Sequence, residues 1–293
     1  MGLNEGGDEA LIKLVEMTDD SEISSIKKIV TDLIAIINNP RSTVQDLKEI
    51  IEIDPPLSAK VLKTANSAYY ASQRKIGDIE QAVIWIGFNE LNDMALSQKV
   101  CEIFTKDELI DGYSRILLWK HSVAVAILAK MIYRRELGIR GDDIYAAGLL
   151  HDIGMIVEDQ FLHDDFKNVL NKFTEEKVSL ADAEFDVFGY NHADVGKALT
   201  DHWNLPREMV TAIGYHHDTF GVPRKFPVMA LTLYISDYLC QMSGIGYCRF
   251  SRKIDETIFK RCLNALGMEQ YAFKMIAEDL KKEISRMESR GLL

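Results

Sequence analysis

The sequence predicts an all-α protein. It contains only 6 Pro and 18 Gly among 293 residues, and a β fold with many turns would require more of these residues. No segment in the first third alternates apolar and polar residues as a half-buried strand does. Apolar residues instead recur at intervals of three and four, as they do at Ile23, Ile26, Ile29, Val30 and Leu33. This spacing is typical of helices with one buried face, and the chain is long enough to bury a proper core.

The N-terminal third begins with residues 1–20, which are rich in glycine and acidic residues, so we expect a flexible leader there. The segment lacks the basic and apolar regions of a signal peptide. Pro40 ends the first predicted helix, and Thr43 offers an N-cap to the second. Asp54 precedes Pro55, which is a favourable start for the third. The predicted helices span residues 23–37, 44–51, 55–65, 79–86 and 91–104.

Further helices are expected in the rest of the chain. The most apolar stretch, residues 122–133, is interrupted by Lys130 and is too short to span a bilayer. We therefore expect a buried helix there and no membrane association. The segment 226–241 is apolar except for Asp237, whose carboxylate is unusual in such a context. The predicted helices span residues 117–137, 142–152, 166–173, 180–188, 192–203, 206–217, 226–241, 255–266 and 271–287.

The overall charge restricts the partners. The chain has 45 acidic against 34 basic side chains and a formal net charge of −11. General nucleic-acid binding depends on Lys and Arg that neutralise phosphates, so we exclude it. A small nucleotide held by a local cation or a metal stays compatible with this charge.

The cysteines indicate the compartment. None of the four forms a C-x-x-C pair, so the sequence shows neither a zinc knuckle nor a redox motif. Without a secretory segment, we expect free thiols and a cytoplasmic location. The four cysteines are Cys101, Cys240, Cys248 and Cys262.

Five of the seven histidines and two acids lie in apolar helical contexts. The other two histidines, His163 and His202, have acidic or polar neighbours and are expected to be solvated. The intervals between members of the apolar set are each long enough for a helix and a turn, so five helices could bring them to a common centre. The set comprises His121, His151, Asp152, His192, His216, His217 and Asp237.

This mixture of side chains indicates metal binding. Imidazole and carboxylate suit divalent ions such as Fe, Mn, Zn or Ni. Five His and two Asp exceed the needs of one tetrahedral ion and match two ions about 3.5–4 Å apart, bridged by a carboxylate. Asp152 is the candidate bridge because it adjoins His151, and it would be the catalytic residue of an active enzyme. Such a site activates water for attack on phosphorus.

Each of these residues also has a purely structural interpretation. A single His on an apolar face is more often a core residue than a ligand, and the His151-Asp152 pair could be an ordinary helix cap. Asp237 could bond to Ser236 or pair with an arginine, and His216 with His217 could lie partly exposed. The presence of all these groups in one chain nevertheless favours a shared polar centre.

Other aromatic and basic residues have less specific interpretations. Aromatic rings near the end of the third helix and at the start of the helix at 117–137 are expected to pack in the core. Three basic residues of that helix are expected to be solvated, although they could face a phosphate. These residues are Tyr69, Tyr70, Trp119, Lys120, Arg134 and Arg135.

Two parts of the sequence resemble known families. The order His121, His151-Asp152, His192, His216-His217, Asp237 resembles the ligand order of the HD superfamily of metal-dependent phosphohydrolases, whose bimetal branch includes the HD-GYP cyclic di-GMP phosphodiesterases. The segment 54–70, DPPLSAKVLKTANSAYY, followed by Ile79-Glu80-Gln81-Ala82-Val83 and Gly87, resembles the HDOD family. That family is the HD-related output domain of bacterial signalling proteins. Together the resemblances cover residues 20–245.

The resemblance implies the domain organisation. An N-terminal helical lobe at residues 21–115 would pack against an HD-type helical bundle at residues 116–245. Separately, we expect the C-terminal helices, within residues 246–293, to pack on that bundle. The resemblance also implies a role in bacterial signal transduction, usually without catalysis. The sequence shows no recognisable receiver, membrane or DNA-binding segment, so we expect signalling proteins to act in trans or to be absent.

Two positions depart from the HD-GYP pattern. Met155 stands where those domains often have a lysine that would position a phosphate. The Gly-Tyr-Pro motif expected after His217 is replaced by residues 218–223, DTFGVP. Both departures argue against hydrolysis of cyclic di-GMP.

Three functions are consistent with this sequence. We hypothesise a regulatory output domain with a dinuclear metal site that binds a nucleotide or another phosphorylated ligand, with weak or no catalysis. The alternative is an active metal-dependent phosphohydrolase that acts on a phosphodiester or nucleotide. The third is a metal-free scaffold for protein partners.

Overall fold

The computed structural model describes residues 5–70, 75–105, 112–176, 178–225, 227–246 and 256–288. The regular elements in these ranges are helices, without a β-strand, so the all-α prediction is confirmed. In chain order they are α1 (Glu5–Met17), η1 (Thr18–Asp20), α2 (Glu22–Asn38), α3 (Val44–Ile53), α4 (Pro55–Ala65), α5 (Ile79–Ile86), α6 (Phe88–Val100), η2 (Cys101–Phe104), α7 (Arg115–Arg135), α8 (Asp142–Leu150), α9 (Ile153–Phe161), α10 (His163–Glu176), α11 (Leu180–Phe188), α12 (His192–His202), α13 (Arg207–Gly214), α14 (Pro227–Met242), α15 (Glu256–Leu266) and α16 (Gln270–Glu288).

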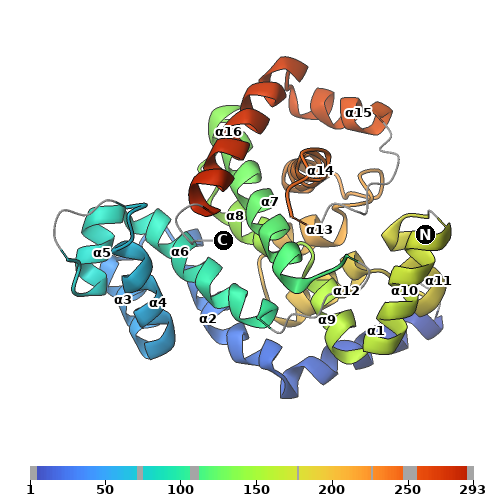
Figure 1. Cartoon of the computed structure of the whole chain (residues 1–293), viewed down its shortest axis with the longest axis horizontal. Helices are drawn as coiled ribbons and strands as arrows, with labels where there is room; N and C mark the ends of the chain where they lie inside the picture. Colours follow the sequence, from blue (N-terminus) through green and yellow to red (C-terminus); the bar gives the residue numbers. More distant parts are fainter. Residues whose placement is uncertain are drawn as a thin grey trace.

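An N-terminal lobe is built around α6. Figure 1 shows α3, α4 and α5 projecting to one side, with α6 between them and the central helices α7 and α8. Asp54 joins two of these helices. Its Oδ1 accepts a hydrogen bond from the Leu57 amide at the start of α4, and its Oδ2 pairs with Lys99 Nζ of α6 at 2.6 Å. The cap therefore also fixes α4 against α6.

The helix α7 is the apolar centre of the second lobe. By length and composition it could cross a membrane, but 67% of its apolar window is buried inside the protein. It packs against α8, α14 and α16, and the Ser114 hydroxyl caps its N-terminus by accepting a bond from the Leu117 amide. The prediction of a buried helix at residues 122–133 is confirmed.

The prediction of a flexible leader is wrong for residues 5–20. These residues form α1 and η1, and α1 packs against α12 and α9. Leu11, Leu14 and Val15 are buried at helical spacing. The many acidic and glycine residues around this short stripe concealed it, although three apolar side chains at such intervals are enough to dock a helix.

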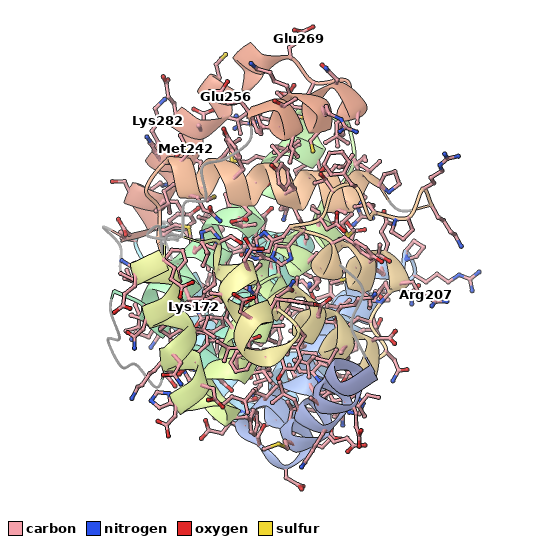
Figure 2. The ribbon with its side chains drawn as sticks, turned by 90° about the vertical axis from the view of Figure 1, so that its right-hand side faces the viewer. Lys172, Arg207, Met242, Glu256, Glu269 and Lys282 are labelled. Carbon is pink, nitrogen blue, oxygen red and sulfur yellow. The ribbon has the colours of Figure 1, made fainter. Side chains whose placement is uncertain are left out.

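The C-terminal helices cover the second lobe. α15 packs against α14, and α16 packs against α7. Figure 2 shows these two helices as a layer over one side of α14, with Glu269 at the outer edge of the layer. The lobe boundaries at residues 115 and 245 stay predictions.

The docking of α1 can be tested by truncating one side chain. Leu14→Ala should lower the free energy of unfolding by about 2–5 kcal/mol, because it removes a buried side chain and leaves a cavity. Urea denaturation measures this change. The matched control is Ile12→Ala, since Ile12 is 61% exposed and Leu14 only 3%. Equal effects of the two substitutions would show that α1 does not dock.

Candidate metal centre

His151 and Asp152 lie at a bend between two helices. α8 ends at Leu150 and α9 begins at Ile153. Asp152 has φ −99° and ψ 16°, in the sparsely populated bridge region where many active-site residues lie. The sequence predicted a helix ending at this pair but no helix at Ile153–Phe161. That omission is corrected by α9, which restarts directly after the bend.

Two glycines allow neighbouring helices to approach this bend closely. A Cβ on Gly148 would lie 2.5 Å from the Cα of Ala126 in α7. A Cβ on Gly154 would lie 2.0 Å from the carbonyl oxygen of His192, at the start of α12. Neither position has space for a side chain, so glycine permits both contacts. Through them, α7 and α12 bring their own histidines to the pair.

The Asp152 carboxylate lies between four imidazoles. Its Oδ2 is 3.1 Å from His151 Nε2 and 3.8 Å from His121 Nε2. Its Oδ1 is 3.4 Å from His216 Nε2 and 3.5 Å from His192 Nε2. Each carboxylate oxygen therefore faces a different pair of imidazole nitrogens, as a carboxylate that bridges two ions would.

Acceptors outside the centre orient three of these rings. His151 Nδ1 donates to the Gly148 carbonyl at 2.8 Å, and His216 Nδ1 donates to the Ile213 carbonyl at 2.6 Å. A carbonyl oxygen can only accept, so each of these Nδ1 atoms carries the proton and Nε2 presents a lone pair in the neutral ring. His192 Nδ1 lies 2.6 Å from Glu184 Oε2. These contacts are typical of the acceptors behind metal-binding histidines.

Asp237 and His217 complete the centre. Asp237 Oδ1 is 2.9 Å from His121 Nε2, and it also accepts a bond from Gln241. His217 Nε2 lies 2.9 Å from His192 Nε2, and its Nδ1 lies 3.9 Å from Asp237 Oδ2. The side chain of His217 is 33% exposed, whereas the other six are almost completely buried. The centre is therefore accessible from the side of His217.

The carboxylates and two of the imidazoles have protonation states that suit a cation, whereas neighbouring carboxylates outweigh burial and raise the pKa of His151 and of His192, the latter to about 9. Burial alone would raise the pKa of Asp152, but the neighbouring imidazoles, above all His151, hold that pKa well below its usual range. Asp237 has a lowered pKa for a similar reason, mainly its hydrogen bond with His121. Burial and adjacent imidazoles lower the pKa of His216 and, more strongly, of His217. Ionised carboxylates and neutral imidazoles are the forms that bind metal.

The buried polar atoms fit a bound metal. His151 Nε2 and His216 Nε2 are buried and have no hydrogen-bond partner among the described residues, a costly state that a cation would relieve. The possible ligand atoms form two groups, and within each group all the atoms lie within 4.8 Å of one another. Asp152 belongs to both groups. One group is His121, His151 and Asp152, and the other is Asp152, His192, His216 and His217.

The structure brings all seven predicted residues together. They come from α7, the α8–α9 bend, α12, the end of α13 and α14. His163 and His202 lie apart from them, half-exposed, and pair with Asp159 and Asp19 respectively. The interpretation of Asp237 as a partner of Ser236 is not supported, since its carboxylate faces His121.

Two buried glutamates were missed by the sequence analysis. Glu184 of α11 accepts from both the backbone amide and the ring of His192. Burial and the neighbouring Glu184 raise the pKa of Glu158 well above its usual range. The detectable signal was the position of Glu184 beside Ala183 on the apolar stripe of its helix, where an acid is as unusual as Asp237.

An all-helical fold around a buried histidine and aspartate centre defines a protein of the HD-related class. The family model of the HDOD domain matches residues 23–219. The chain belongs to the HDOD family, and the resemblance seen in its sequence is confirmed.

Solved structures share this fold. An HDOD domain protein of unknown function from Geobacter sulfurreducens is 27% identical, with a TM-score of 0.79 over 96% of this chain and 97% of that chain. A candidate signal transduction protein from Marinobacter aquaeolei VT8 is 20% identical, with a TM-score of 0.77 over 99% and 67%. A candidate phosphohydrolase from Shewanella amazonensis SB2B is 22% identical, with a TM-score of 0.69 over 97% and 96%. The last two show similarity of fold alone.

A curated relative is considerably longer. An uncharacterized protein of Treponema pallidum (strain Nichols) is 26% identical over 227 residues. The match covers 72% of this chain and 41% of that protein, so the chain spans less than half of that relative's length.

The close approach of α9 and α12 generates a prediction. Gly154→Ala should lower the free energy of unfolding by about 1–3 kcal/mol or more, because its Cβ overlaps the His192 carbonyl. Urea denaturation measures the loss. The control is Gly77→Ala, whose Cβ would meet only the Gln81 side chain at 3.8 Å. A loss no greater than that of the control would contradict the contact.

Proposed function

We propose that this protein is a regulatory output domain that binds two divalent transition-metal ions, of Fe, Mn, Zn or Ni, and a phosphorylated ligand, with little or no turnover. The observation that carries the proposal is the position of Asp152, whose two carboxylate oxygens face separate pairs of imidazoles. His121 and His151 would hold one ion with Asp152, and His192, His216 and His217 would hold the other. Asp237, whose Oδ1 lies 2.9 Å from His121 Nε2, would complete the ligands of the first ion.

Bound ions of this kind would supply Lewis-acid activation of water and neutralise phosphate charge. The residues around the centre argue for slow hydrolysis. Met155, the residue after Gly154, is apolar and only 2% exposed, so it contributes no cation to hold a phosphate. In the loop after His217, the Asp218 carboxylate accepts from the amides of Phe220 and Gly221. That carboxylate is used to close a turn.

A second function, metal-dependent phosphohydrolysis, is favoured by one observation. The partial exposure of His217 gives the centre access to solvent, and both water and a phosphate ester need such access. Asp152 would then be a catalytic residue through the ions that it bridges. The candidate phosphohydrolase from Shewanella amazonensis has a name that agrees with this alternative, but its similarity to this chain is one of fold alone.

The metal content tests the proposal directly. The purified protein should contain two transition-metal ions per chain by elemental analysis, and His151→Ala should lose most of this metal, because it removes an imidazole that faces the Asp152 bridge. His202→Ala is the matched control, since His202 pairs with Asp19 away from the centre, and it should retain the metal. Wild-type protein that binds no metal when Fe, Mn, Zn and Ni are supplied would contradict the proposal and favour the metal-free scaffold.

The role of Glu184 behind the ligands gives a further prediction. Glu184→Gln should weaken metal binding by about 10–100-fold, the usual effect of removing an acceptor behind a metal-binding histidine. Titration against a competing chelator measures the affinity. The control is Asp186→Asn, because Asp186 lies on the same helix but pairs with Lys172 at the surface. Equal affinities would show that His192 is not a ligand that Glu184 orients.

Turnover separates the two functions. Metal-loaded protein, supplied with a panel of nucleotides and phosphodiesters, should hydrolyse them more slowly than about 1 per second, the low end for enzymes. Faster hydrolysis that His151→Ala abolishes would establish the phosphohydrolase instead.

A further inference from the structure

A large cavity lies between the two lobes, apart from the metal centre. Its volume is about 980 Å³, near the upper end of the range of roughly 300–1,000 Å³ for small-molecule sites. The helices α4, α6, α7 and α16 line it. None of the seven residues of the metal centre is in its lining.

The two sites use opposite faces of α7. Trp119, Val123 and Ile127 line the cavity, and their spacing of four places them on one face of the helix. His121 is two residues from Trp119, which is about 200° around a helix of 3.6 residues per turn. The cavity is thus separated from the metal centre by the body of α7.

The deep part of the cavity has an acceptor without a donor. Asp93 of α6 lines the cavity and is only 6% exposed. Its Oδ2 is paired with Lys130 Nζ, but its Oδ1 is buried without a hydrogen-bond partner in the described part of the chain. Ser67 Oγ, also in the lining, is in the same state. Buried polar atoms normally have partners, but each of these two has less than 1 Å² of accessible surface, so they belong to the packed wall of the cavity and do not face a ligand.

Aromatic rings form part of the walls. Tyr69 and Tyr70 lie just after α4 with their ring centroids 4.7 Å apart, and Trp119 of α7 also lines the cavity. These rings were expected only to pack in the core. Trp119 is 9% exposed and does pack in the core, and Arg286 lies over the Tyr69 ring at 4.4 Å from its centroid. The ring surface open to the cavity is therefore that of the half-buried tyrosines, and a flat heterocycle stacks favourably on such a surface.

Cations are concentrated at this cavity. Its lining has six Lys and Arg side chains against four carboxylates, in a chain whose net charge is −11. Lys63 is exposed at the end of α4, and no described residue pairs with its ammonium group. Lys282 of α16, labelled in Figure 2, is 75% exposed, and its ammonium group lies 3.4 Å from the Asp279 carboxylate. Both can hold a phosphate at the entrance while Lys130 remains paired in the interior.

We propose that this cavity is a nucleotide-binding site. The base would stack on the tyrosine rings, and the phosphates would lie near Lys63 and Lys282. The site is separate from the metal centre, and the proposal does not depend on metal binding.

The test is isothermal titration calorimetry of the full chain with AMP, ADP, GMP and GDP, and with adenosine, guanosine and inorganic phosphate as partial ligands. At least one nucleotide should bind with a Kd below about 1 mM, and the partial ligands should bind at least about tenfold more weakly. The double variant Lys63→Glu, Lys282→Glu should raise the Kd by about tenfold or more. Its matched control is Lys48→Glu, Lys281→Glu, which changes the net charge equally at lysines outside the lining.

A second variant tests the cavity without changing charge. Gln98→Trp, at a half-buried lining position of α6, should fill the space and abolish binding while the circular dichroism stays that of the wild type. The proposal is overturned if no nucleotide binds, if phosphate alone binds as well as the nucleotides, or if both charge variants have the same effect. It is also overturned if His151→Ala abolishes nucleotide binding and Gln98→Trp does not, because the ligand then lies at the metal centre. That last result would support the proposed function while excluding the interlobe site.

Discussion

The Asp152 carboxylate, enclosed by four imidazoles, is the constraint on which the second lobe depends. A buried carboxylate is costly unless charges or donors surround it, and here those groups come from α7, α12 and the end of α13 as well as from its neighbour His151. The helices must converge within a few ångströms for this to occur. Gly148 and Gly154 make the convergence sterically possible, because each faces the backbone of a neighbouring helix.

The orientation of the rings follows a simple local pattern. His151 and His216 each donate from Nδ1 to the carbonyl three residues earlier, at the end of their own helix. The last carbonyls of a helix lack partners within it. A histidine just beyond the end can donate its Nδ1 proton to one of these carbonyls, and its Nε2 then points away from the helix. His192 lies at the start of α12, where no such carbonyl is free, and Glu184 from another helix replaces it. Each of the three rings therefore has an acceptor at Nδ1, which is a backbone carbonyl for His151 and His216 and a carboxylate for His192.

The helix α7 joins the metal centre and the interlobe cavity. His121 projects to one site, while Trp119 and Lys130 line the other. The C-terminal helix α16 closes the cavity through polar contacts, including Arg135 with Asp279 at 2.6 Å and Lys120 with Glu288 at 3.0 Å. Lys120 and Arg135, which were expected to be solvated or to face a phosphate, thus pair with carboxylates of α16 at the surface, where such pairs contribute little stability.

The sequence by itself determined the all-α class and the seven residues of the centre. Helical periodicity is a local property, and histidines or a lone Asp237 on apolar segments are visible without knowledge of the fold. At residues 5–20 the local composition predicted a flexible leader, but the buried side chains of Leu11, Leu14 and Val15 dock α1 against α12 and α9. Only the tertiary structure decided which imidazoles face each oxygen of Asp152, that Glu184 accepts from the His192 ring, and that Asp93 pairs with Lys130 in the wall of a cavity. These facts depend on distances between segments far apart in the chain, and packing sets such distances.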